Sequence, residues 1–63
     1  MYIYYVVVNG YMLGNRFDYG AQVELDHEIK TIDDITYLSE WFYKKHHMEC
    51  ATVLNWKLLE KRG

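Results

Sequence analysis

Tyr2-Ile3-Tyr4-Tyr5-Val6-Val7-Val8 is the stretch that decides the fold of this chain. Side chains of a β-strand point to opposite faces in turn, so a strand with one wet face alternates apolar and polar residues. This run has no polar interruption, which is typical of a strand covered on both faces. Because 63 residues offer little material for two coverings, we expect one face to meet another molecule.

A second strand is expected over residues 16–29, where apolar and polar residues alternate. It is long for a strand, so Gly20 is a candidate for a bulge or bend. The connection before it has two interpretations. Either Asn9-Gly10 forms a type I′ hairpin turn and Gly14 marks a bulge, or residues 9–15 form a longer loop.

A helix is expected to begin at Thr31, a capping residue followed by two carboxylates that suit the positive end of a helix. It should end near residues 44–47, where Lys and His suit the negative end. Its apolar stripe consists of Ile35, Leu38, Trp41 and Phe42. A final strand over residues 51–59 is apolar on both faces.

The predicted fold is a single α+β domain over residues 1–63 with the element order β-β-α-β. The first strand is central in a three-stranded sheet of order 2-1-3. The helix covers one sheet face and acts as a crossover that lets the third strand lie parallel to the first. We expect the other face to form a homodimer, because small chains commonly gain stability by oligomerisation.

The composition limits the partners, the cofactors and the cellular location that we expect. A net charge of −2 argues against nucleic acid as the partner. A single cysteine permits no internal disulfide, offers no zinc pattern and suits a reducing cytoplasm. The apolar N-terminal run is too short to span a membrane and lacks the features of a signal peptide. We expect a cytoplasmic protein that binds neither membrane nor cofactor.

An acidic ladder is the first candidate binding surface. It consists of Asp18, Glu24, Asp26 and Glu28. On a strand, every second residue is about 6.7 Å apart, which resembles the spacing of phosphates along a nucleic acid. The ladder has two interpretations: a surface that imitates DNA or RNA for a basic partner, or a solvated face that keeps an edge strand soluble, which is the favoured one.

Aromatic residues form the second candidate surface. Tyr2, Tyr4, Tyr5 and Trp56 are interpreted as core and dimer-interface residues, since aromatic side chains dominate interface energetics. With Tyr19, they could instead stack nucleic-acid bases, but no basic residues interleave with the rings.

His46-His47-x-x-Cys50 is the one pattern that suggests a metal site or a nucleophile. No fourth ligand or orienting group accompanies it, so a helix end followed by an inert cysteine is favoured. No catalytic residue and no metal ligand is assigned.

The chain resembles short accessory proteins encoded by phages and prophages of Gram-positive bacteria. The resemblance lies in the first strand, in Gly14-Asn15, in the helix entry around Asp33-Asp34, and in the ending Val53-Leu54-Asn55-Trp56. It implies a non-enzymatic inhibitor of a host or anti-phage defence protein, such as a CRISPR component. The alternative is a small nucleic-acid-binding or regulatory module that uses the sheet aromatics.

Overall fold

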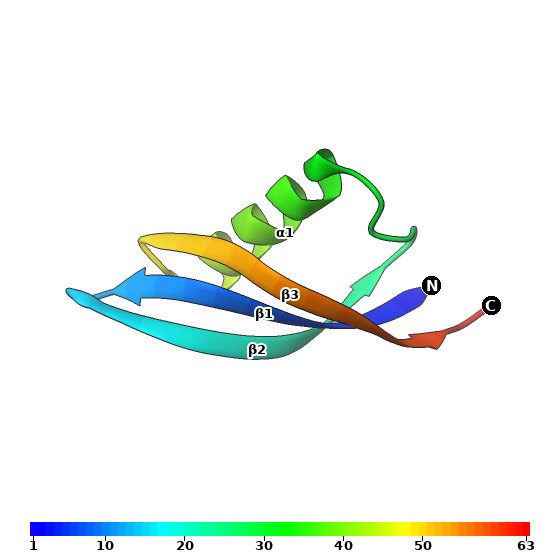
Figure 1. Ribbon diagram of the computed structural model, residues 1–63, viewed down its shortest axis with the longest axis horizontal. Coiled ribbons are helices and arrows are strands. Elements are labelled where there is room, and N and C mark those ends of the chain that lie inside the picture. Colours follow the sequence, from blue (N-terminus) through cyan, green and yellow to red (C-terminus); the bar gives the residue numbers. More distant parts are fainter.

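The chain folds into a three-stranded sheet with one helix on one face (Figure 1). A computed structural model describes all residues from 1 to 63. The elements are β1 (Tyr2–Met12), β2 (Asn15–Leu25), α1 (Ile32–Lys45) and β3 (Cys50–Lys61). This order confirms the predicted α+β class. The sheet order is β2-β1-β3, so β1 is central as predicted, and β2 and β3 each have a free edge.

β3 runs antiparallel to β1, so the prediction of a parallel pair is wrong. The crossover starts where β2 ends, beside the first residues of β1. It returns the chain to the hairpin end of the sheet, where β3 begins opposite Tyr11 (Figure 1). The helix therefore joins β2 and β3, which point in the same direction and have β1 between them.

Leu13 and Gly14 form the turn between β1 and β2. They have φ angles of 52° and 81°, and the pair Met12–Asn15 closes the hairpin directly outside them. Two successive positive φ angles in a two-residue loop define a type I′ turn. Both interpretations of residues 9–15 are therefore wrong, because Gly14 belongs to the turn and no longer loop exists.

Gly10 lies within β1, where it pairs with Phe17 of β2. A Cβ atom at Gly10 would lie 2.9 Å from Sδ of Met48 and 3.1 Å from Cζ of Phe17. Gly10 thus leaves room for the buried Met48 side chain, which packs directly on the backbone of β1, and the chain does not turn there.

The core lies between the sheet and α1. Val6 and Val8 of β1 are completely buried and share one cluster with Leu38 and Phe42 of α1, which are also completely buried. The full cluster is Tyr4, Val6, Val8, Val23, Leu25, Leu38, Phe42 and Met48. Burying each such side chain stabilises the fold by about 1.5–3 kcal/mol. The predicted helix stripe is confirmed at Leu38 and Phe42, while Trp41 packs at the margin of the cluster and Ile35 is half-buried.

Thr31 begins α1 as predicted. Its hydroxyl accepts a hydrogen bond from the backbone N–H of Asp34, and the Asp34 carboxylate accepts one from the backbone N–H of Thr31. This reciprocal pair is a capping box. At the other end, His47 has a φ angle of 55°, and the Met48 N–H donates to the Tyr43 carbonyl, which closes the helix.

β3 carries two bulges. Its register against β1 shifts at Leu54 and again at Leu59, whereas the β1–β2 ladder is continuous. The bulge predicted at Gly20 is therefore wrong. Because of the second shift, Lys57 and Glu60 lie opposite Tyr5 and Ile3 of β1, and so on the same sheet face.

Leu13→Asn is expected to stabilise the protein. A left-handed conformation is unfavourable for leucine, whereas asparagine tolerates it, so the free energy of unfolding should rise by about 0.5–1 kcal/mol. Urea unfolding of both proteins measures the difference. Leu13→Ala is the control, because it also shortens this side chain, which is 85% exposed, but lacks the carboxamide that lets asparagine tolerate a left-handed conformation. An equal gain in both variants would contradict a backbone origin.

Candidate functional site

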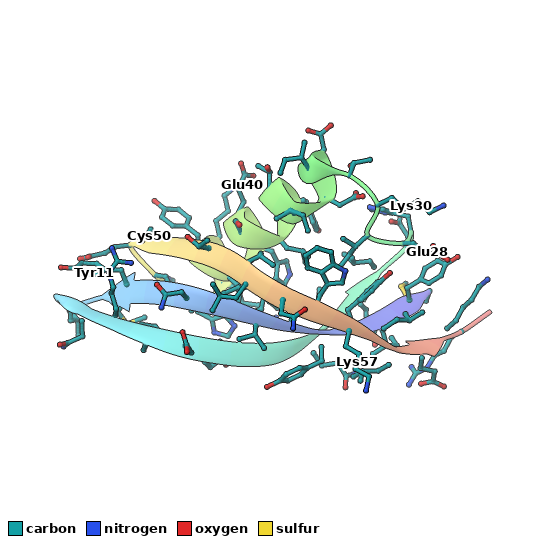
Figure 2. The ribbon with its side chains drawn as sticks, viewed as in Figure 1. Tyr11, Glu28, Lys30, Glu40, Cys50 and Lys57 are labelled. Carbon is teal, nitrogen blue, oxygen red and sulfur yellow. The ribbon has the colours of Figure 1, made fainter.

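The sheet face opposite α1 is less apolar than the sequence predicts. β1 contributes Ile3, Tyr5 and Val7 to it, but β3 contributes mainly Thr52, Asn55, Lys57 and Glu60. Figure 2 shows Lys57 projecting from the side of the sheet away from the helix. The expectation that both strands leave apolar side chains on this face is therefore wrong for β3.

Of the three apolar residues of β1 on this face, Ile3 is buried within the chain, Val7 is half-buried and Tyr5 is exposed. Ile3 is only 2% exposed, although it lies outside the core cluster. The Tyr5 ring lies diagonally across β2 on Gly20, at the place where a Cβ atom would stand. The chain itself thus covers this face of β1 only in part, and dimerisation through it stays a prediction.

The four aromatic residues proposed as an interface do not form one surface. Tyr4 is buried, and its hydroxyl accepts a hydrogen bond from the Ile29 N–H at 3.0 Å. Tyr2 packs against the core under Lys61, whose Nζ lies 5.5 Å from the ring centroid. Tyr5 is exposed on the face opposite α1. Trp56 is exposed on the helix side, opposite Val6.

The predicted acidic ladder is broken in the structure. Asp18 and Glu24 lie on the same face of β2, but six residues apart, or about 20 Å. Asp26 and Glu28 follow the end of β2 and belong to the connection with α1, the loop that carries Glu28 and Lys30 in Figure 2. The regular spacing that suggested an imitation of nucleic acid is absent beyond Leu25, because the strand ends there.

Asp18 is also engaged within the chain. Its carboxylate accepts a hydrogen bond from the Asn9 amide at 3.1 Å, and the Asn9 oxygen accepts one from Arg16 at 3.2 Å. The acidic charge available to a partner is therefore concentrated around residues 24–34, at the end of the sheet away from the hairpin.

His27 links this acidic region to the start of α1. Its Nδ1 lies 2.6 Å from Asp26 Oδ1, and its Nε2 lies 2.8 Å from Asp34 Oδ1. A neutral imidazole donates from one nitrogen only, so both contacts are donated bonds only in the protonated ring. Hydrogen bonds to Asp26 and Asp34 raise the pKa of His27. Sequence reasoning missed this bridge, since the three residues are linked by a loop conformation rather than by a period.

The Asp34 carboxylate takes part both in the capping box of α1 and in the contact with His27. The backbone N–H groups of Lys30 and Thr31 donate to it and, with the smaller effect of His27, lower its pKa to about 2. Asp34 therefore stays ionised in its cap over the physiological range.

The histidines and the cysteine near the end of α1 do not meet. No hydrogen bond joins Cys50 to either histidine, and Cys50 is exposed at the start of β3 (Figure 2). The His46 ring stacks on Phe42 at 5.7 Å and contacts Tyr19 edge-on at 4.7 Å. No three His, Cys, Asp or Glu side chains converge where they could hold a metal ion.

An exposed apolar row on β3 is the feature that sequence reasoning missed. We define the edge row as Leu54, Trp56, Leu58 and Leu59, which are 54%, 41%, 43% and 51% exposed. Four of the eleven exposed large hydrophobic residues of the chain thus fall within six positions. The run was predicted to be apolar on both faces, but not to be exposed along an edge. It is exposed because β3 lies at the edge of the sheet.

No helix of the structure has the length and apolar character needed to cross a membrane.

Comparison of the chain with family models, with curated proteins and with solved structures finds no match.

The stability of the protein is expected to fall above neutral pH. His27 has a raised pKa in the folded state, so its contribution is complete below its ordinary value of 6.5 and is lost as the pH rises through the raised pKa. Asp34 acts in the opposite sense: its contribution is complete above 3.8 and is lost as the pH falls toward about 2. Thermal unfolding should thus have its highest midpoint at about pH 4–6.5.

His27→Gln tests the origin of the alkaline decline. It should lower the midpoint at pH 5 and leave it little changed at pH 8.5, because the bridge is already weakened there. His46 and His47 remain in the variant and report any general effect of histidine titration. An unaltered pH profile in His27→Gln would contradict the assignment.

Proposed function

We propose that this chain is a non-enzymatic binding protein that acts on another protein. The edge row carries this proposal. Soluble monomers rarely leave large apolar side chains exposed in contiguous groups, and such groups commonly mark interaction surfaces. Trp56 lies within this row. Tryptophan is one of the residue types enriched among the few interface residues that contribute most of the binding energy.

The state of the reactive side chains also supports binding rather than catalysis. A nucleophile is usually activated by a base within hydrogen-bonding distance, and Cys50 has no such neighbour. His27 has both nitrogens committed to carboxylates that belong to the helix cap and its approach.

The resemblance to short phage and prophage proteins suggests a host or anti-phage defence protein as the partner, met in the host cytoplasm. The carboxylates of Glu24, Asp26 and Glu28 would complement a basic surface on that partner and accelerate association. They lie on β2 and the following loop, on the far side of β1 from the edge row. The two surfaces can therefore act independently.

The alternative function, a nucleic-acid-binding module, has weaker support. Base stacking by a sheet commonly uses two or three aromatic rings on one face. Of the four aromatic residues considered, Tyr5 is exposed opposite α1, Tyr4 is buried and Trp56 lies on the other face. Lys57 lies opposite Tyr5 in the sheet. Ile3, the next residue of β1 on the same face, lies between Glu60 of β3 and Glu24 of β2.

The proposal is tested by capture of a partner from the lysate of a Gram-positive host that carries an active defence system. The full chain should retain one protein in a stoichiometric ratio, and Glu24→Lys/Asp26→Lys should weaken this binding about tenfold or more at low salt. Glu40→Lys is the matched control, because it reverses an exposed acidic charge on α1.

Two results would count against the proposal. The first is the absence of any stoichiometric partner together with unchanged defence against phage in cells that produce the chain. The second is tight binding of mixed oligonucleotides in a polarisation titration at low salt, which would favour the alternative.

A further inference from the structure

The outer edge of β3 is open to another strand. β3 pairs with β1 on one side only, and its other side has no neighbour in the sheet. Natural edge strands are commonly protected by charges or proline. Between Cys50 and Leu59, Lys57 is the single charged residue, and the chain contains no proline.

The charges near the end of β3 are self-complementary. In an antiparallel pair of two copies centred between Leu58 and Leu59, Lys57 of each copy lies opposite Glu60 of the other. Two residues that are three apart normally point to opposite faces. The bulge at Leu59 places Lys57 and Glu60 on the same face, so each can meet the other across the seam.

The remaining pairs of this register also fit. Leu58 of each copy lies opposite Leu59 of the other, which brings four exposed leucines together at the centre. Trp56 lies opposite Lys61 of the second copy, and both residues are on the helix side, opposite Val6 and Tyr2 of their own β1. Lys61 already lies over an aromatic ring in its own chain, so a similar contact with the indole is chemically suitable.

Lys57 is free to form this contact, since no carboxylate of its own chain pairs with it. Glu60 is bonded to Arg62 at 3.1 Å, but its side chain remains 55% exposed. A carboxylate has two oxygens and can accept from both cations.

We propose that β3 pairs antiparallel with β3 of a second copy, with Lys57 opposite Glu60, to form a six-stranded sheet that carries both helices on one face. This inference rests on the proposed binding function and divides it between the two surfaces: a second copy occupies the edge row, and the acidic residues are left for the host protein. A second copy suits this edge because it supplies the complementary charge at both ends of the seam, Glu60 for Lys57 and Lys57 for Glu60. The acidic residues around position 24 stay exposed at the two outer edges of the dimer.

The test is the solution mass by light scattering across dilution, combined with charge reversal. The natural chain should have twice the mass of 7.7 kDa. Lys57→Glu or Glu60→Lys alone should weaken association about tenfold or more, because each dimer then contains two pairs of like charges. The double variant Lys57→Glu/Glu60→Lys should restore it, and so should an equimolar mixture of the two single variants.

Circular dichroism controls for folding, since both positions are exposed. A monomeric natural chain, single variants that associate as well as the natural chain, or a double variant that fails to recover would each overturn the proposed seam. A monomer whose partner capture is abolished by Leu58→Lys would overturn the seam but support the binding function. A dimer that captures no host protein would support the seam but overturn the binding function.

Discussion

The packing of α1 on β1 is the constraint on which the rest of the structure depends. Leu38 and Phe42 close over Val6 and Val8, and the chain has no other core. The helix has 14 residues and is about 21 Å long, whereas the 12 residues of β3 extend to about 40 Å. One helix of this length cannot cover the whole sheet. The far half of β3 is thus left exposed, and Trp56, Leu58 and Leu59 of the edge row lie there (Figure 1).

The elements of the fold could be predicted because each has a local signal. Apolar content marks β1, alternation marks β2, and Thr31 with Asp34 marks the start of α1. The turn could not be located, because Leu13 has no preference for a positive φ angle. The better turn sequence, Asn9-Gly10, lies inside β1 instead, where Met48 packs on Gly10. The direction of β3 could not be read from the sequence. The crossover starts from β2 and makes β3 parallel to β2, and β3 is therefore antiparallel to β1.

The candidate surfaces were harder to predict, because they depend on what lies beside each residue. The run Val53-Leu54-Asn55-Trp56 resembles the start of β1 in composition, yet β1 is central and β3 is at the edge. Strand order, together with the limited length of α1, decides that one run is buried and the other exposed. The acidic ladder failed for a similar reason. Alternation continues through Glu28, but β1 begins at Tyr2, and β2 therefore has no strand to pair with after Leu25.

The two free edges differ in a way that favours closed assembly over open-ended growth. β2 forms a regular ladder with β1, whereas β3 is bulged at Leu54 and Leu59. Pairing of β3 with β2 of another copy would leave a new free edge at each step and generate a filament. A twofold axis instead closes the assembly, because the bulge at Leu59 lets Lys57 of each copy meet Glu60 of the other. An irregular edge strand usually prevents association. In this chain the irregularity of β3 favours a second copy as the partner and a dimer as the assembly.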